Sequence, residues 1–150
     1  MSNSPRISAR AIIVDAGRLL LVNSYPAARG SALWCAPGGG AERHTSLAEN
    51  LIREVHEETG LLVDVGSLAL VDEFHEPEEG IHQVNLFFRC RIAQGVLDPH
   101  WRDPDGTVHD RRFFAPEELE AIHFRPISLG RVAFDCDQPV IVEPLRIMVT

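Results

Sequence analysis

Three consecutive glycines precede a predicted helix with three glutamates on one side in the stretch PGGGAERHTSLAENLIREVHEETGL, residues 37–61. On a helix, Glu54, Glu57 and Glu58 share one arc because their spacing is i, i+3, i+4. The arc overlaps the edge of the apolar stripe, so these carboxylates are not wholly in water. Clustered, partly desolvated carboxylates either raise one another's pKa or bind a hard divalent ion, and their oxygens suit Mg²⁺ or Mn²⁺. The glycines upstream leave room for backbone and ligand to approach closely.

Arg53 lies one turn before Glu57 and is expected to hold it by a charge-assisted hydrogen bond. Glu54 and Glu58 then lack a counter-charge from the helix. The alternative is an ordinary solvated face, since Glu and Arg are good helix formers. The overlap with the apolar stripe and the glycines upstream favour a ligand site.

These residues closely resemble the Nudix box, G-x5-E-x7-R-E-U-x-E-E-x-G-U, in which U is a bulky aliphatic residue. The match runs from Gly39 to Leu61, and every fixed position agrees except Thr45, where the family has glutamate. Arg29, Trp34 and the PGG at residues 37–39 resemble the residues that commonly precede the box. With the flanking elements, the resemblance extends over roughly residues 7–125.

The resemblance implies a Nudix hydrolase, which cleaves a nucleoside diphosphate linked to another moiety by metal-assisted attack of water on phosphorus. It implies that Glu57 and Glu58 bind the metal, and that Glu54 is either a ligand or the base that deprotonates the water. Arg53 would orient Glu57. The backbone of Gly39 or Gly40 would add a carbonyl ligand and room for the diphosphate.

Residues outside the acidic helix complete the expected site. The resemblance also implies a further metal-binding carboxylate, for which Asp110, near the last strand before the Pro116 helix, is chosen over Asp103, Asp105 and the glutamates of the acidic turn (Glu76, Glu78 and Glu79), although any one of these is more commonly a surface residue. The expected substrate-binding residues are Arg29, Trp34, Gly38, Gly39 and Gly40.

Thr45 is the departure from the family pattern. It either lowers activity, changes the metal preference, or is replaced by another carboxylate, for which Glu42 is favoured over Glu49 because Glu49 points away from the acidic arc. Thr45 is equally well explained as a helix cap. A second hypothesis is therefore a weakly active or inactive domain that binds a nucleotide metabolite in a regulatory role. A third makes the glycines and glutamates purely structural, with the acidic surface a protein-binding face.

The remaining pattern predicts a mixed α/β domain, and the resemblance implies a Nudix-like α/β (α+β) fold, a mixed β-sheet core packed between helices. HQVNLFFRCRI alternates as a one-sided strand with Val84, Leu86 and Phe88 inward. The predicted elements are a hairpin from Ile7 around Asp15–Gly17, a loop at 25–31, a strand at 32–36, a PGGG turn, a helix from a cap at Thr45 or Ser46 to about Thr59 with Gly60 as its C′ residue, strands at 61–74, 81–93 and 108–114, a short helix from Pro116, a helical turn in SLGRVAF and an extended edge in the tail.

Composition sets the class of protein. The 150 residues, 45% of them hydrophobic, fit a single domain over 1–150 with a sizeable core. The net charge of −8 disfavours duplex nucleic acid and anionic membranes as partners, and a phosphate-bearing small-molecule substrate would need cations such as Mg²⁺ or Mn²⁺. Three separated cysteines, without signal peptide or spanning segment, indicate the cytoplasm. A homodimer is kept as an expectation.

Overall fold

The computed structural model describes residues 4–23 and 32–148. Over these residues, ten strands form one mixed sheet that carries three α-helices and one 3₁₀ helix. The elements in chain order are β1 (Arg6–Asp15), β2 (Arg18–Asn23), β3 (Leu33–Cys35), β4 (Gly38–Gly40), α1 (Leu47–Thr59), β5 (Leu62–Glu76), η2 (Pro77–Glu79), β6 (Ile81–Gln94), β7 (Asp110–Phe114), α2 (Pro116–Leu119), β8 (His123–Phe124), α3 (Ser128–Phe134), β9 (Ile141–Val142) and β10 (Arg146–Ile147).

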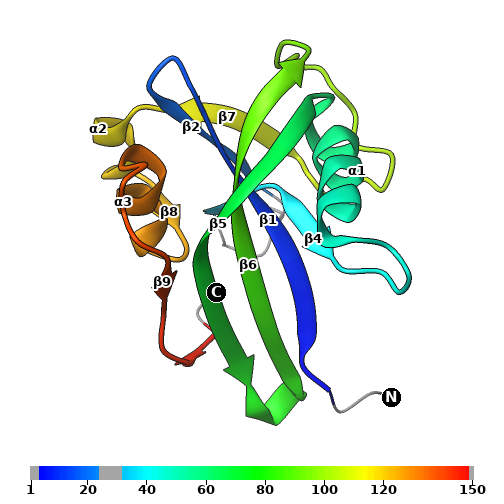
Figure 1. Cartoon of the computed structure of the whole chain (residues 1–150), viewed down its shortest axis with the longest axis vertical. Coiled ribbons are helices and arrows are strands. Elements are labelled where there is room, and N and C mark those ends of the chain that lie inside the picture. Colours follow the sequence, from blue (N-terminus) through cyan, green and yellow to red (C-terminus); the bar gives the residue numbers. More distant parts are fainter. Residues whose placement is uncertain (1–3, 24–31, 149–150) are drawn as a thin grey trace.

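The sheet runs in the order β10-β5-β6-β1-β2-β3-β8, with β4 added to β1, β7 to β2 and β9 to β5. Its centre is the parallel pair β1 and β6, and the long β5–β6 hairpin extends it on one side. Figure 1 shows α1 on one side of this sheet and α2 and α3 on the other. The predicted mixed sheet between helices is confirmed.

Alternation along β1 sends successive side chains to two separate cores. Ala9, Ala11 and Ile13 pack beneath α1 with Leu51 and Val55. The even positions face the other way, where Ile12 joins Phe87 and Leu129 under α3. Arg6 and Arg10, which are also at even positions, therefore lie on the face opposite α1.

The predicted PGGG turn is wrong, because Gly38–Gly40 form β4 and pair antiparallel with Ser8, Ala9 and Arg10. Their lack of side chains is what permits the pairing. Gly38 has a φ of 151°, and a Cβ there would overlap the carbonyl oxygen of Ala9. The glycines thus bring a strand edge, rather than a turn, against the helix that follows.

Both predicted ends of α1 are confirmed, and its cap is settled. Ser46 accepts a hydrogen bond from the backbone N–H of Glu49 at 3.1 Å, so Ser46 and not Thr45 is the N-cap. Gly60 ends the helix in the left-handed region at φ 77°, and its N–H donates to the carbonyl of His56.

The prediction of a one-sided strand at β6 is wrong. Asn85 and Phe87 are the buried residues of this strand, whereas Val84, Leu86 and Phe88 are partly exposed. The sheet is covered on both sides here, so Phe87 packs under α3 while Phe88 packs under α1. The predicted edge path of the tail is confirmed, since β9 and β10 both add to the outer side of β5. The predicted loop at 25–31 lies outside the described residues.

Asp103 organises the loop between β6 and β7. Its carboxylate accepts hydrogen bonds from the backbone N–H groups of Asp105, Thr107 and Val108 and from the Thr107 hydroxyl, at 2.9 to 3.2 Å. Burial raises the pKa of Asp103, but these donors outweigh it and hold the pKa below its usual value.

We expect Asp103→Asn to destabilise the protein by about 1–3 kcal/mol at pH 7, because an amide NH₂ would face N–H donors. A lowered folded-state pKa gives stability that is present above the unfolded pKa and is lost as the pH falls through the folded one. Urea unfolding should be measured at pH 7 and at a pH below the ordinary pKa of aspartate. The difference in free energy of unfolding between wild type and variant should be smaller at the acid pH. A difference that stays constant with pH would contradict this account.

Candidate active site

Arg53 donates hydrogen bonds to several side chains on and beside the acidic helix. Its Nη1 donates to both carboxylate oxygens of Glu57, at 3.1 and 3.2 Å, as predicted from the spacing. Its Nη2 reaches Glu42 at 3.1 Å, Asn50 at 3.0 Å and Glu54 at 3.2 Å. One guanidinium therefore fixes the orientation of Glu57 and ties the helix to the loop before it.

Glu54 lies directly against the glycine strand. A Cβ built on Gly39 would stand 2.5 Å from the carboxyl carbon of Glu54, so only glycine leaves room for this side chain. The side chain is 18% exposed. Burial raises the pKa of Glu54, and the nearby Arg53 opposes this effect.

Glu58 is the most buried of the three carboxylates. It accepts a hydrogen bond from the backbone N–H of Gly38 at 3.2 Å and is only 8% exposed. Burial raises the pKa of Glu58 to about 8, although the charge of Arg10 and the Gly38 N–H act in the opposite direction. The prediction that the acidic arc borders the buried face is thus confirmed at this residue.

The C-terminal end of α1 accepts hydrogen bonds from the side chains of Trp101 and Arg111. The indole N–H of Trp101 donates to the carbonyl of Glu57 at 2.9 Å. Arg111, only 6% exposed, donates to the carbonyls of Glu58 at 2.7 Å, Trp101 at 2.6 Å and Val108 at 3.4 Å. These donors satisfy carbonyls that a helix end leaves without partners, and they fix the turn that carries Glu57 and Glu58.

The donor set fits a hard divalent cation. Glu54 and Glu58 carry pKa values raised by burial, and the Glu54 carboxylate fills the space that a side chain at residue 39 would need. Carboxylate and carbonyl oxygens are the ligands that Mg²⁺ and Mn²⁺ take. Within residues 4–23 and 32–148, no three His, Cys, Asp or Glu side chains converge as a preformed metal site. Mg²⁺ usually keeps waters and recruits substrate phosphates, so few protein ligands are needed.

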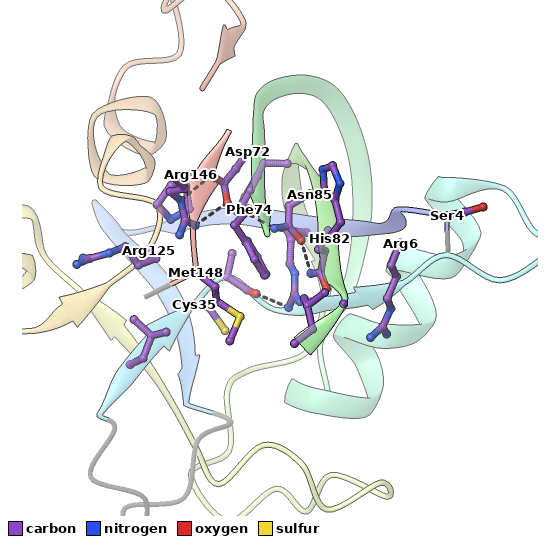
Figure 2. A pocket seen from close by; sticks show the side chains of 18 residues that line it. Ser4, Arg6, Cys35, Asp72, Phe74, His82, Asn85, Arg125, Arg146 and Met148 are labelled. Carbon is purple, nitrogen blue, oxygen red and sulfur yellow. Dashed lines mark hydrogen bonds and ion pairs between the residues drawn. The ribbon is translucent and has the colours of Figure 1, made fainter. Parts of the chain in front are cut away.

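A cavity of about 620 Å³ opens on the face of the sheet opposite α1. Arg6 and Arg10 line its end beside β4, where the Arg10 guanidinium donates to the carbonyls of Ala36 and Gly38, each at 3.3 Å. A Cβ on Gly40 would stand 2.5 Å from the Arg6 guanidinium. Figure 2 shows Arg6 at one end of this cavity and Arg146, paired with Asp72, at the other.

A model of the NUDIX domain family matches residues 4–132. The chain belongs to the Nudix hydrolase family. The resemblance predicted from residues 37–61 is thereby confirmed. Among curated proteins, this Nudix domain is 28% identical over 95 residues to a putative ADP-ribose pyrophosphatase, YjhB, of Bacillus subtilis. The alignment covers 61% of this chain but only 44% of that relative.

Solved Nudix structures share the fold at low identity. A UDP-X diphosphatase has a TM-score of 0.70 at 22% identity, covering 93% of this chain and 68% of that one. A MutT Nudix hydrolase from Burkholderia pseudomallei has a TM-score of 0.69 at 22% identity, covering 87% and 96%. An ADP-ribose pyrophosphatase from Streptococcus suis has a TM-score of 0.66 at 21% identity, covering 97% and 100%.

The predicted residues of this Nudix domain fall into two groups. Arg53, Glu54, Glu57, Glu58 and the glycines of β4 come together as described above. Elsewhere, Asp110 is exposed and lies 3.5 Å from Arg112. Trp34 is 8% exposed and packs edge to face on Phe114, outside the cavity lining. Arg29 lies outside the described residues.

Of the two carboxylates considered in place of the missing glutamate, Glu42 reaches Arg53 at 3.1 Å. Glu49 lies in the first turn of α1 and is exposed. The position of Glu42 agrees with the preference for it, while its role stays a prediction.

Sequence reasoning missed most of the cavity. The signal for Arg6 and Arg10 was present, since two arginines four residues apart in a strand must face the same side. Asn85 and Asp72 carried no such signal, because polar residues at alternate strand positions are ordinarily solvent-facing. None of the helices in the described ranges is long and apolar enough to cross a bilayer.

Proposed function

We propose that this Nudix domain hydrolyses the diphosphate linkage of a nucleoside diphosphate joined to another moiety, with Mg²⁺ or Mn²⁺. The observation that carries the proposal is the meeting of two oppositely charged groups at β4. Arg6 and Arg10 approach the glycines from one face of the sheet, and Glu54 and Glu58 approach from α1. A chain of net charge −8 has little other reason to gather cations in one cavity.

Each residue has a defined part in this proposal. Arg6 and Arg10 bind the diphosphate oxygens along the edge of β4. Glu54 accepts the proton of the attacking water, and Arg53 holds Glu57 in the orientation required. Glu54, Glu57 and Glu58, with the carbonyl of Gly39, would hold the metal, which when bound lowers the pKa of water and neutralises the leaving phosphate.

The names of several relatives support the substrate class. One curated relative is described as a putative ADP-ribose pyrophosphatase, and a structural neighbour is a UDP-X diphosphatase. We propose the wider class of nucleotide and nucleotide-sugar diphosphates for this chain. The homodimer, the cytoplasmic location, Asp110 as a ligand, and Arg29 and Trp34 as substrate contacts stay predictions.

The direct test is hydrolysis of a panel of nucleoside triphosphates, nucleotide sugars, ADP-ribose and dinucleotides with Mg²⁺ or Mn²⁺. We expect turnover of at least one member that EDTA abolishes. In ¹⁸O-labelled water the label should enter a product phosphate, because water attacks phosphorus. Label in the other moiety, or turnover that survives EDTA, would contradict the proposal.

Thr45 motivates a second candidate, a Nudix domain that binds a nucleotide metabolite with little turnover. We expect Thr45→Glu, which restores the family residue, to be neutral or to raise kcat/KM, because an added carboxylate beside a cation is favourable. The measurement compares both proteins on the same panel with Mg²⁺ and Mn²⁺. If neither shows metal-dependent turnover while the folded protein binds a panel member, the regulatory candidate replaces the hydrolase.

A further inference from the structure

Strands β6, β5 and β10 carry a fixed polar network that extends across the sheet from Gln83, the partner of Arg6, to Arg146. Arg146 donates to the two carboxylate oxygens of Asp72, from Nε at 3.2 Å and Nη2 at 2.9 Å. Asn85 donates to the same carboxylate at 3.5 Å and accepts a hydrogen bond from Gln83 at 2.7 Å. All four residues line the cavity, so we call them the polar floor.

Part of the polar floor comes from outside the matched domain. The family match ends at residue 132, whereas Arg146 belongs to β10, which pairs in parallel with Phe74 and His75 of β5. Met148 donates its backbone N–H to the carbonyl of His75 at 2.9 Å and also lines the cavity. The C-terminal segment of this chain therefore builds one wall of its own cavity.

The charge of the polar floor is balanced. Asp72 is 1% exposed and its charge is neutralised by Arg146, so the polar floor itself offers no net charge to a second anion. It offers directed donors and acceptors instead. A guanidinium has five N–H groups, of which the bonds to Asp72 use two, and an amide NH₂ has two donors, of which Asn85 gives one to Asp72.

Two neighbours of the polar floor add to this chemistry. The Phe74 ring, with the Arg146 guanidinium 5.2 Å from its centroid, provides a flat apolar surface in the cavity wall. Ser8 pairs with Asn85 across β1 and β6, and its buried hydroxyl has no hydrogen-bond partner among the described residues. Paired polar groups beside an apolar ring suit a neutral ligand with adjacent hydroxyl groups.

We infer that the polar floor is the subsite for a sugar with a vicinal diol, and that Asp72 and Arg146 determine specificity for it. The inference rests on the proposed function for the diphosphate half of the ligand, which lies at the β4 end. Asp72 accepts from the hydroxyl groups, Asn85 and Arg146 donate to them, and Phe74 packs on the apolar side of the ring. The diol belongs to either sugar of a nucleotide sugar, the nucleoside ribose or the sugar beyond the diphosphate.

The test is equilibrium binding in EDTA, where nothing is turned over, so that it is independent of hydrolysis. The probes are UDP-glucose, its analogue with 2′-deoxyribose in the nucleoside, and its analogue with 2-deoxyglucose. Sites built to bond a hydroxyl reject ligands that lack it. We expect one analogue to bind at least about tenfold more weakly to the wild type, and which analogue it is identifies the sugar in the subsite. Equal Kd values for all three, within about twofold, would overturn the inference.

Variants assign the effect to the polar floor. Asp72→Asn should reduce the discrimination between the probes to below about threefold, and Arg146→Lys should reduce it in part, because lysine lacks the planar fork. The matched control is Asp64→Asn, which breaks an exposed ion pair between Asp64 of β5 and Arg91 of β6. This variant should keep the wild-type ratio of the Kd values. Unchanged discrimination in folded Arg146→Lys and Asp72→Asn would place the subsite elsewhere. Should Asp72→Asn fail to fold, Arg146→Lys and the wild-type comparison decide the matter. Discrimination without turnover on the substrate panel would sink the hydrolase proposal and leave this one standing.

Discussion

Glu58→Gln should lower kcat for metal-dependent hydrolysis by roughly 10²–10³-fold, the usual cost of removing one group that stabilises charge in the transition state. Glutamine has the same shape and can still accept the hydrogen bond from the Gly38 N–H, so the fold should persist. What is lost is a carboxyl group beside Glu54 that the proposed cation would bind in its ionised form, although burial raises its pKa. Steady-state kinetics over a range of Mg²⁺ and Mn²⁺ concentrations measure the effect.

Glu49→Gln is the matched control for this variant. Glu49 lies in the first turn of the same helix, exposed and far along the helix from Glu58, so it changes net charge equally without touching the site. We expect its kcat to stay within about twofold of the wild type, since surface substitutions usually have small effects. Equal kcat values for Glu58→Gln and Glu49→Gln would show that Glu58 takes no part in metal binding or catalysis.

Arg111→Ala should lower the free energy of unfolding by about 3 kcal/mol or more. It would remove the Arg111 donor from the buried carbonyls of Glu58 and Val108 and from the part-buried carbonyl of Trp101, and each unsatisfied buried group costs roughly 1–3 kcal/mol. The loss falls where α1 is anchored. Urea unfolding followed by circular dichroism gives the value.

Arg111→Lys separates charge from geometry. A lysine keeps the positive charge near the C-terminal end of α1 but cannot donate to three carbonyls in a fixed fork. We therefore expect a loss between those of wild type and Arg111→Ala. If Arg111→Ala unfolds at the wild-type urea midpoint, these hydrogen bonds contribute nothing to stability.

The acidic helix was predictable because its information is local. The spacing of Arg53 and Glu57 fixes their contact by helical geometry alone, and Gly60 marks the helix end by its own backbone preference. The same holds for the hairpin at Asp15–Gly17, where β1 and β2 pair as expected.

The cavity was not predictable because its information is spread along the chain. Asp72, Asn85 and Arg146 meet only through the pairing of β5 with β6 and of β5 with β10, and no local pattern specifies those registers. The glycine strand was missed for a related reason. A glycine triplet favours a turn by composition, and only the partner strand β1 makes it extended.

The three adjacent glycines of β4 each lie against a different neighbouring group. A Cβ at residue 38 would overlap the backbone of Ala9, one at residue 39 would displace the carboxyl group of Glu54, and one at residue 40 would displace the guanidinium of Arg6. If the proposed function holds, substitutions at these three positions would act separately on the fold, on the carboxylate of the chemical step and on the arginine that binds the diphosphate. Single substitutions along β4 would therefore separate these three effects.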